Sequence, residues 1–197
     1  MTTNNQAYQS HRHLVLGGAR SGKSSFAEQQ ALCALEACSN GRLHYIATAT
    51  YLDDEMRERI AHHQDRRGKE WIEHEVPVEL ATKLQSFNQG DVVLIDCLTL
   101  WLNNIIFELG DEATNEQVEA VVEALVRSVE QSPAHIIMVS NEVGLGVVPL
   151  GKVSRLFVDN AGRMNQALAR VVERVTLIAA GLPLNLKPSN HSFDAKS

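Results

Sequence analysis

A chain of 197 residues, 44% of them hydrophobic and 21% charged, can bury a core of ordinary size without disulfides or a structural metal. Its formal net charge of −6 repels phosphate backbones at long range, which argues against nucleic acid as a partner. The odd count of three cysteines, with no C-x-x-C pair, argues against a disulfide framework and a zinc site. No apolar run is long enough for a signal peptide or a membrane span, so we expect a cytoplasmic protein that makes no membrane contact.

The composition along the chain divides it into three regions. We expect a flexible polar arm over residues 1–12, a single folded domain over residues 13–187 and a C-terminal tail over residues 188–197. The stretch after Gly181 carries two prolines among polar residues. We therefore expect it to lie over the surface or to fray.

Short apolar runs alternate with helical patterns along the chain. In order, we expect strand 13–16, helix 23–37, strand 43–47, helix 53–66, strand 71–76, helix 78–87, strand 92–95, helices 98–109 and 116–130, strand 136–140, helix 153–173 and strand 175–179. This alternation predicts an α/β fold with a mostly parallel sheet covered by helices on both faces. Ligands of such sheets bind at the carboxyl ends of the strands.

The turn after the first predicted strand reads GGARSGKS and fits the pattern G-x-x-x-x-G-K-[ST]. Its glycines allow positive φ, so that backbone N–H groups can curl around an anion, and the next helix points its N-terminal donors at the same phosphate. Lys23 can reach the β and γ phosphates, and the Ser24 hydroxyl can ligate Mg²⁺. With a strand before it and a helix after it, the turn predicts a P-loop that binds nucleotide rather than a chance glycine-rich turn. The predicted contacts are Gly17, Gly18, Ala19, Arg20, Ser21, Gly22, Lys23 and Ser24.

The predicted helix 53–66 carries two adjacent histidines, and Asp53 is a plausible N-cap for it. His63 continues an apolar stripe, whereas His62 shares a face with charged residues. A neutral imidazole on a wet, charged face can attack a phosphorus atom at pH 7. The alternative is a solvated, charged helix that carries two ordinary histidines.

The strand 92–95 is followed by Asp96, at the carboxyl end of an apolar run. This is the position of the acidic residue that assists Mg²⁺ binding in P-loop proteins. Asp96 could instead, or in addition, serve as the N-cap of the helix that begins near Leu98. Given the P-loop, we expect the metal role.

Two later segments carry polar residues near the same edge of the predicted sheet. Asn141 and Glu142, in SNEVGLGVVP, stand where a site is expected, although an ordinary strand-to-helix turn explains them too. The segment 159–169 places several polar side chains inside a helical pattern, where they could line a pocket or cover a solvent face.

Several of these segments together resemble one family. They are GGARSGKSSFAE (17–28), YIATAT followed by DDEMRERIAHHQDRR (45–67), W-x-x-x-E-x-P (71–77), LIDCLTLWLNN (94–104), SNEVGLGVVP (140–149) and AGRMNQALA (161–169). The sequence resembles the bifunctional adenosylcobinamide kinase/adenosylcobinamide-phosphate guanylyltransferases of cobalamin biosynthesis, over about residues 13–187. The polar arm before residue 13 is longer than the start that is usual in that family.

The resemblance implies two reactions on a RecA-like P-loop fold that assembles as a homotrimer. The family phosphorylates adenosylcobinamide with ATP or GTP, and then transfers GMP from GTP to that phosphate through a GMP–histidine intermediate. By motif position His62 carries the GMP. The implied nucleotide contacts beyond the P-loop are Ala47, Thr48, Ala49, Gln64, Asp65, Arg66, Arg67, Glu75 and Asp96. The implied partners are therefore small molecules and further copies of the chain. Two rival functions remain, a monofunctional small-molecule kinase and a non-catalytic nucleotide switch.

Overall fold

The structure, a computed structural model, describes residues 11–38, 40–49, 68, 70–110, 112–146 and 150–188. In chain order the elements are β1 Arg12–Gly17, α1 Lys23–Glu36, β2 Leu43–Ala47, β3 Trp71–Glu75, α3 Leu80–Leu84, β4 Val92–Asp96, α4 Leu98–Leu109, α5 Asn115–Gln131, β5 His135–Asn141, α6 Lys152–Val171, β6 Arg174–Ala179 and β7 Leu182–Lys187. The predicted helix 53–66, including its N-cap Asp53, lies outside the described residues. The other described elements follow the predicted order, apart from a shorter helix α3 and the additional strand β7.

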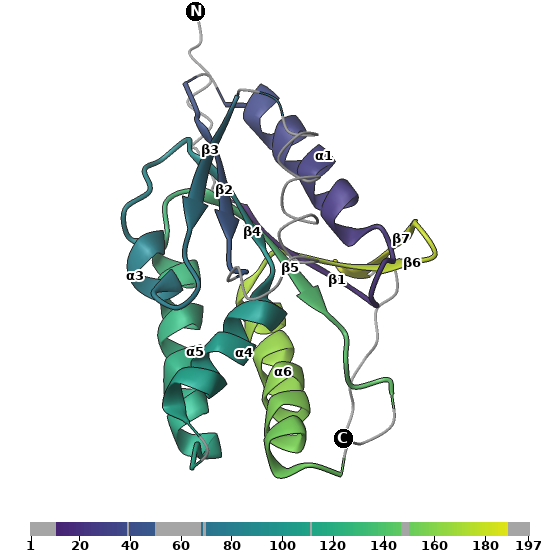
Figure 1. The fold of residues 1–197 in the computed structure, drawn as a ribbon. Coiled ribbons are helices and arrows are strands. Elements are labelled where there is room, and N and C mark those ends of the chain that lie inside the picture. Colours follow the sequence, from purple (N-terminus) through teal and green to yellow (C-terminus); the bar gives the residue numbers. More distant parts are fainter. Residues whose placement is uncertain are drawn as a thin grey trace, which may run out of the picture.

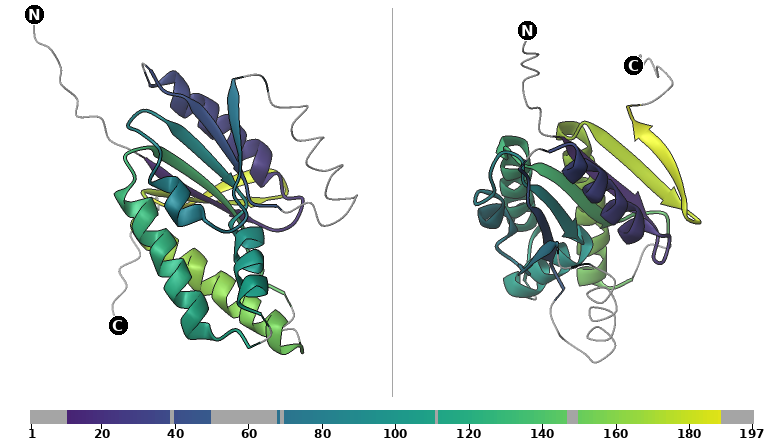
Figure 2. Two further views of the ribbon diagram at one scale, coloured as in Figure 1. Left: turned by 60° about the vertical axis from the view of Figure 1, so that its left-hand side comes forward. Right: turned by 90° about the horizontal axis from the view of Figure 1, so that it is seen from above.

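The strands form one seven-stranded sheet in the order β3-β2-β4-β5-β1-β6-β7. All neighbouring pairs are parallel except β6 and β7, which pair antiparallel. Helix α1 covers one face, while α4, α5 and α6 cover the other, as Figures 1 and 2 show. The predicted α/β P-loop architecture, with helices on both faces of a mostly parallel sheet, is therefore confirmed.

The two faces of the sheet carry separate hydrophobic cores, because side chains alternate along each strand. Val15 of β1 and Leu94 of β4 pack with Ala27 of α1. On the opposite face, Leu14 and Ile95 pack among residues of α4, α5 and α6. Since both faces are covered, the central strands read as continuous apolar runs rather than as alternating ones. No helix in the described part of the chain has both the length and the apolarity that crossing a bilayer requires.

The helix after Pro77 is shorter than the predicted helix 78–87. Helix α3 spans Leu80–Leu84, with Glu79 as its N-cap. Side chains of α4 bind the carbonyl groups just before it: Trp101 Nε1 donates to Val78 at 2.7 Å, and Asn104 Nδ2 donates to Pro77 at 3.1 Å. These carbonyls face α4, and the helix begins only beyond them.

The expectation that the stretch after Gly181 only covers the surface or frays is wrong for residues 182–187. Ala180 and Gly181 have φ of 52° and 80° and form a two-residue connection between β6 and β7. Positive φ at both loop residues matches the twist of paired strands and closes a tight hairpin. Pro183 is tolerated because β7 is an edge strand, in which one row of N–H groups has no ladder partner.

A buried histidine makes the stability of this sheet dependent on pH. His13 of β1 is 4% exposed, and its Nε2 lies 2.8 Å from Thr176 Oγ1 of β6. Thr176 in turn donates to Asn185 Oδ1 of β7 at 3.2 Å. The hydroxyl proton is thus engaged, so His13 donates from Nε2 as a neutral imidazole. Burial, and then the charge of Arg174, lower the pKa of His13 from 6.5 to about 4.

We predict that acid destabilises the fold through His13. Because the pKa of His13 is lower in the folded than in the unfolded chain, the unfolded chain binds more protons below pH 6.5, and stability falls as the pH drops toward 4. Between pH 7.5 and pH 5 this contributes a loss of about 2 kcal/mol. Urea unfolding at both pH values measures it. In His13→Gln the loss should be smaller by about that amount, and an equal loss in both proteins would contradict the assignment.

Candidate functional site

The register of the parallel strands brings most of the predicted site residues to one edge of the sheet. Glu75 of β3 pairs with Ala47 of β2, and Ala47 pairs with Asp96 of β4. Two strands further along, Gly17 of β1 is flanked by Asn141 of β5 and Ile178 of β6. Each of these residues lies at or near the carboxyl end of its strand, where α/β proteins bind ligands.

The loop between β1 and α1 depends on two glycines. Gly17 has φ of 157°, and a Cβ built there would lie 2.5 Å from the carbonyl oxygen of Ile178. Gly22 has φ of 97° and is the left-handed N-cap of α1. The expectation of positive φ at Gly18 is not confirmed, because the third left-handed residue is Arg20, with φ of 55°. The helix begins at Lys23, as predicted.

Three backbone hydrogen bonds brace this loop. Ser21 N–H donates to the Gly18 carbonyl at 3.3 Å, and Gly181 N–H donates to the Ser21 carbonyl at 2.9 Å. Glu142 N–H donates to the Gly17 carbonyl at 3.1 Å. Gly181 was not among the predicted site residues. The hairpin signal at Ala180–Gly181, followed by leucines at alternate positions, could have shown that a turn closes there.

Lys23 points its charge into the loop. It is 8% exposed, and its Nζ donates to the Gly18 carbonyl at 2.7 Å. Burial lowers the pKa of Lys23, while the charges of Cys97 and Asp96 raise it. The ammonium group is therefore close enough to the end of β4 to feel the Asp96 carboxylate. Next along α1, Ser24 lies half-buried in the first helical turn.

Asp96 ends β4 and is half-buried. The alternative that it is the N-cap of α4 is wrong, because Cys97 is the N-cap residue. The Asp96 side chain thus serves no cap, which leaves its carboxylate for another partner. Burial, and then the charge of Asp96, raise the pKa of the Cys97 thiol to about 11. The thiol therefore stays protonated at neutral pH and is a poor nucleophile.

The segment after β2 contributes buried rather than accessible side chains. Thr48 is fully buried, and its hydroxyl is 2.7 Å and 2.9 Å from the carbonyl oxygen and nitrogen of Cys97. Ala47 and Ala49 on either side are half-buried, whereas Glu75, at the end of β3, is exposed. The Thr48 side chain therefore faces its neighbours in the protein.

The end of β5 is held by hydrogen bonds to two helices. Asn141 N–H donates to Thr99 Oγ1 of α4 at 2.7 Å. Ser140 Oγ donates to Asn165 Oδ1 of α6 at 2.7 Å, and Asn165 Nδ2 reaches the Asn141 carbonyl at 3.3 Å. The buried side chain of Asn165 thus links α6 to β5, whereas Asp159, earlier on α6, is exposed.

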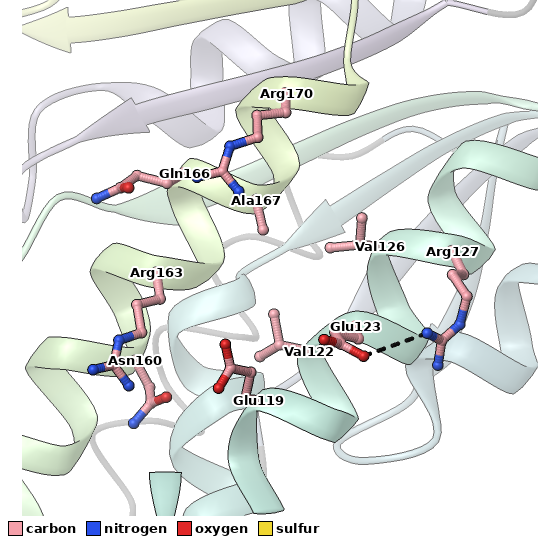
Figure 3. A pocket seen from close by; sticks show the side chains of 10 residues that line it. All are labelled: Glu119, Val122, Glu123, Val126, Arg127, Asn160, Arg163, Gln166, Ala167 and Arg170. Carbon is pink, nitrogen blue, oxygen red and sulfur yellow. Dashed lines mark hydrogen bonds and ion pairs between the residues drawn. The ribbon is translucent and has the colours of Figure 1, made fainter. Parts of the chain in front are cut away.

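The polar side chains on the outer face of α6 line a groove against α5, with a volume of about 440 Å³ (Figure 3). Glu119 and Glu123 come from α5, and Arg163, Gln166 and Arg170 come from α6. The figure shows the ion pair that Arg127 makes with Glu123, at 3.5 Å. The lining contains none of the predicted nucleotide contacts, so this groove is separate from the P-loop edge.

Five of the predicted site residues lie outside the described part of the chain. They are His62, Gln64, Asp65, Arg66 and Arg67. They belong to residues 50–67, which follow the end of β2 in the chain and precede β3.

The P-loop between β1 and α1 and the carboxylate at the end of β4 together define an α/β P-loop protein that binds nucleotide. The chain belongs to the cobinamide kinase/cobinamide phosphate guanyltransferase family, whose model matches residues 13–186.

Curated relatives agree with this family. The chain is 49% identical, over 89% of its own length and 97% of the relative's, to the bifunctional adenosylcobalamin biosynthesis protein CobP of Pseudomonas aeruginosa. It is 38% identical, over 88% and 98%, to the corresponding CobU of Escherichia coli. A solved structure of a Pyrococcus horikoshii protein shares the fold alone, at 10% identity and a TM-score of 0.50, over 92% of this chain and 88% of that one.

We predict that Gly17→Ala unfolds at a lower temperature than the wild type and loses nucleotide binding. The added methyl group meets the Ile178 carbonyl at 2.5 Å, so either β6 or the loop must move. Overpacking of this kind costs about 1–3 kcal/mol. Thermal unfolding and calorimetric titration with GTP measure the two effects.

Gly18→Ala is the matched control for the stability effect. It adds the same group where nothing lies within 4 Å. It should unfold within about 2 °C of the wild type, as a shift of a few tenths of a kcal/mol would give. Equal unfolding temperatures for the two variants would refute the steric argument.

Proposed function

We propose that this chain catalyses both steps of its family: phosphorylation of adenosylcobinamide with ATP or GTP, and transfer of GMP from GTP to the resulting phosphate. The observation that carries the proposal is a P-loop with Lys23 buried inside it and Asp96 nearby, in a chain that the family model matches over residues 13–186. Near-complete coverage of two bifunctional relatives supports the presence of both activities.

In the kinase step, the substrate hydroxyl oxygen attacks the γ-phosphorus and its proton is released to water, while the bond to the bridging oxygen breaks and the nucleoside diphosphate leaves. Negative charge accumulates on the phosphoryl oxygens and on the bridging oxygen in the transition state. The N–H groups of the P-loop and the first turn of α1 stabilise that charge, as does the Lys23 ammonium group. Since Lys23 is buried, its charge acts on the phosphate with little screening by water.

In the guanylyl step, a neutral imidazole attacks the α-phosphorus of GTP and pyrophosphate leaves. The phosphate of adenosylcobinamide phosphate then displaces the imidazole and yields adenosylcobinamide-GDP. We assign the nucleophile to His62 from its motif position. Two transfers with an enzyme-bound intermediate mean that the two anionic substrates need not react directly with each other.

The residues at this edge also suit Mg²⁺ that arrives with the nucleotide. The Ser24 hydroxyl and the Asp96 carboxylate would hold it, with phosphate oxygens as further ligands. The described residues contain no cluster of three or more His, Cys, Asp or Glu that could hold a metal by itself, in keeping with a metal held partly by substrate. When bound, the ion would neutralise charge on the β and γ phosphates.

We further propose that the chain assembles as a homotrimer. The described surface exposes large apolar side chains that contact between copies would cover. Leu145 and Leu150, between β5 and α6, are 85% and 94% exposed, and Phe107 near the end of α4 is 86% exposed.

Lys23→Ala should lose the kinase step while the protein stays folded. Removal of one preorganised donor at a reacting oxyanion costs about 10²- to 10³-fold in kcat. Release of ADP with cobinamide as acceptor, at saturating ATP, measures it. Lys152→Ala, which removes an exposed lysine from the start of α6, is the control and should turn over normally. Full activity of Lys23→Ala at saturating ATP would exclude the role.

His62→Ala should abolish covalent labelling by GTP while leaving the kinase step intact. With GTP labelled at the α-phosphorus, the wild-type protein should acquire a label that acid releases, because phosphoramidates are acid-labile. Labelling should also fail at low pH, since a protonated imidazole cannot attack. His63→Ala is the matched control and should keep the label. If His62→Ala is still labelled, the nucleophile lies elsewhere. If the wild type never is, the chain is a monofunctional kinase.

A further inference from the structure

Thr48 directs all of its polar groups at its neighbours in the protein. Its Oγ1 accepts a hydrogen bond from Cys97 N–H at 2.9 Å and donates one to the Cys97 carbonyl at 2.7 Å. Its own N–H donates to the Asp96 carbonyl at 3.3 Å. Both the backbone just before Cys97 and the backbone just after it are therefore held by one side chain that is fully buried.

The Thr48 side chain extends the hydrogen bonding between β2 and β4 by one residue beyond the last backbone pair of these strands. Ala47 and Asp96 are the final partners in the register of β2 and β4. The chain then turns into α4, which has Cys97 as N-cap, so a ladder bond to Cys97 cannot come from a strand. The Thr48 hydroxyl supplies both the acceptor and the donor that such a partner would have provided.

Asn104 of α4 holds Thr48 from the other side. Its Nδ2 donates to the Thr48 carbonyl at 2.8 Å and to the Pro77 carbonyl at 3.1 Å. The ends of β2 and β3 are thereby attached to the same helix that begins after Asp96. The charge of Asp96 raises the pKa of Lys23, so the Asp96 carboxylate lies close enough to the P-loop to interact with it electrostatically. The hydrogen bonds of Thr48 hold the backbone on either side of Cys97, the residue after Asp96.

We propose that Thr48 is a positioning residue that fixes the direction of the Asp96 carboxylate and thereby sets the affinity of the site for Mg²⁺ with nucleotide. The proposal rests on the proposed role of Asp96 as a metal ligand. Groups that orient a ligand commonly change metal affinity by about 10- to 100-fold when they are removed. A threonine whose role is only structural would instead change stability at every Mg²⁺ concentration alike.

The test is calorimetric titration of the full chain with a GTP analogue that has a methylene bridge between its α and β phosphorus atoms, so that His62 cannot cleave it. Binding is measured over a series of free Mg²⁺ concentrations. Thr48→Val keeps the shape of the side chain but loses both hydrogen bonds to Cys97. It should raise the half-maximal Mg²⁺ concentration about tenfold or more. Thr48→Ser retains the hydroxyl and should behave like the wild type.

Thr176→Val is the matched control. Thr176 is 1% exposed and its hydroxyl also makes two hydrogen bonds, to His13 and Asn185, away from the P-loop edge. This variant should lose thermal stability but keep the wild-type Mg²⁺ dependence. An equal shift in Thr176→Val and Thr48→Val would show a general effect of lost stability and would overturn the proposal.

Asp96→Asn separates this proposal from the proposed function. If the wild type binds the analogue equally well at all Mg²⁺ concentrations, the metal role of Asp96 fails and the role of Thr48 fails with it. If Asp96→Asn loses the Mg²⁺ dependence but Thr48→Val keeps it, only the role of Thr48 is wrong. Should circular dichroism show that Thr48→Val is unfolded, Asn104→Ala replaces it, because it removes the support of Thr48 from outside. Asn104→Ala should raise the half-maximal Mg²⁺ concentration at least about threefold, and an unchanged value would overturn the proposal.

Discussion

Parallel strands end together at one edge of a sheet, and there their last backbone groups leave the ladder. Buried N–H and carbonyl groups need hydrogen-bond partners, so this edge must find them beyond the strands. In this protein the edge lies at Glu75, Ala47, Asp96, Asn141 and Gly17. The way these ends are completed decides which groups are held by the protein and which face a ligand.

Two kinds of ending follow from this constraint. At β2, β4 and β5, short polar side chains complete the hydrogen bonds: Thr48 for Cys97, Asn104 for Thr48, and Thr99 and Asn165 for Asn141. At β1, glycines turn the chain so that a loop and the first turn of α1 follow at once. The first N–H groups of a helix have no partner within the helix, so they remain available for an anion. The hydrogen-bonded ends of β4 and β5 thus lie on the same edge of the sheet as the phosphate-binding loop that follows β1.

The sequence predicts what depends on local pattern. Apolar runs located six of the strands, and GGARSGKS located the loop and the start of α1. It failed where tertiary contacts decide. Trp101 and Asn104 bind the carbonyls of Val78 and Pro77, which no helical pattern reveals, and α3 begins only at Leu80. Strand β7 was missed because two prolines and polar residues outweighed its alternating leucines, although an edge strand accepts a proline.

The site shows the same division. The predicted roles of Lys23 and Asp96 follow from motif and position. Their proximity depends on the order of the strands, in which only β5 lies between β4 and β1, and the sequence pattern does not give that order. Thr48 is the instructive case. Family resemblance names it as a nucleotide contact, but its hydroxyl is directed at Cys97, so any influence on nucleotide through that hydroxyl must pass through the backbone of β4. Periodicity cannot distinguish a side chain that touches a ligand from one that holds a ligand-binding residue.

The charge of the chain also has to be considered locally. A formal net charge of −6 disfavours long anionic polymers, yet a triphosphate needs positive potential over only a few ångströms. Lys23 supplies it inside a loop of backbone N–H groups, where low exposure strengthens the attraction. The neighbouring Cys97 thiol has its pKa raised to about 11, so at neutral pH it stays protonated and does not compete as a nucleophile. The covalent guanylyl intermediate that we propose therefore needs another group that is neutral and nucleophilic at pH 7, and the imidazole of histidine has that property.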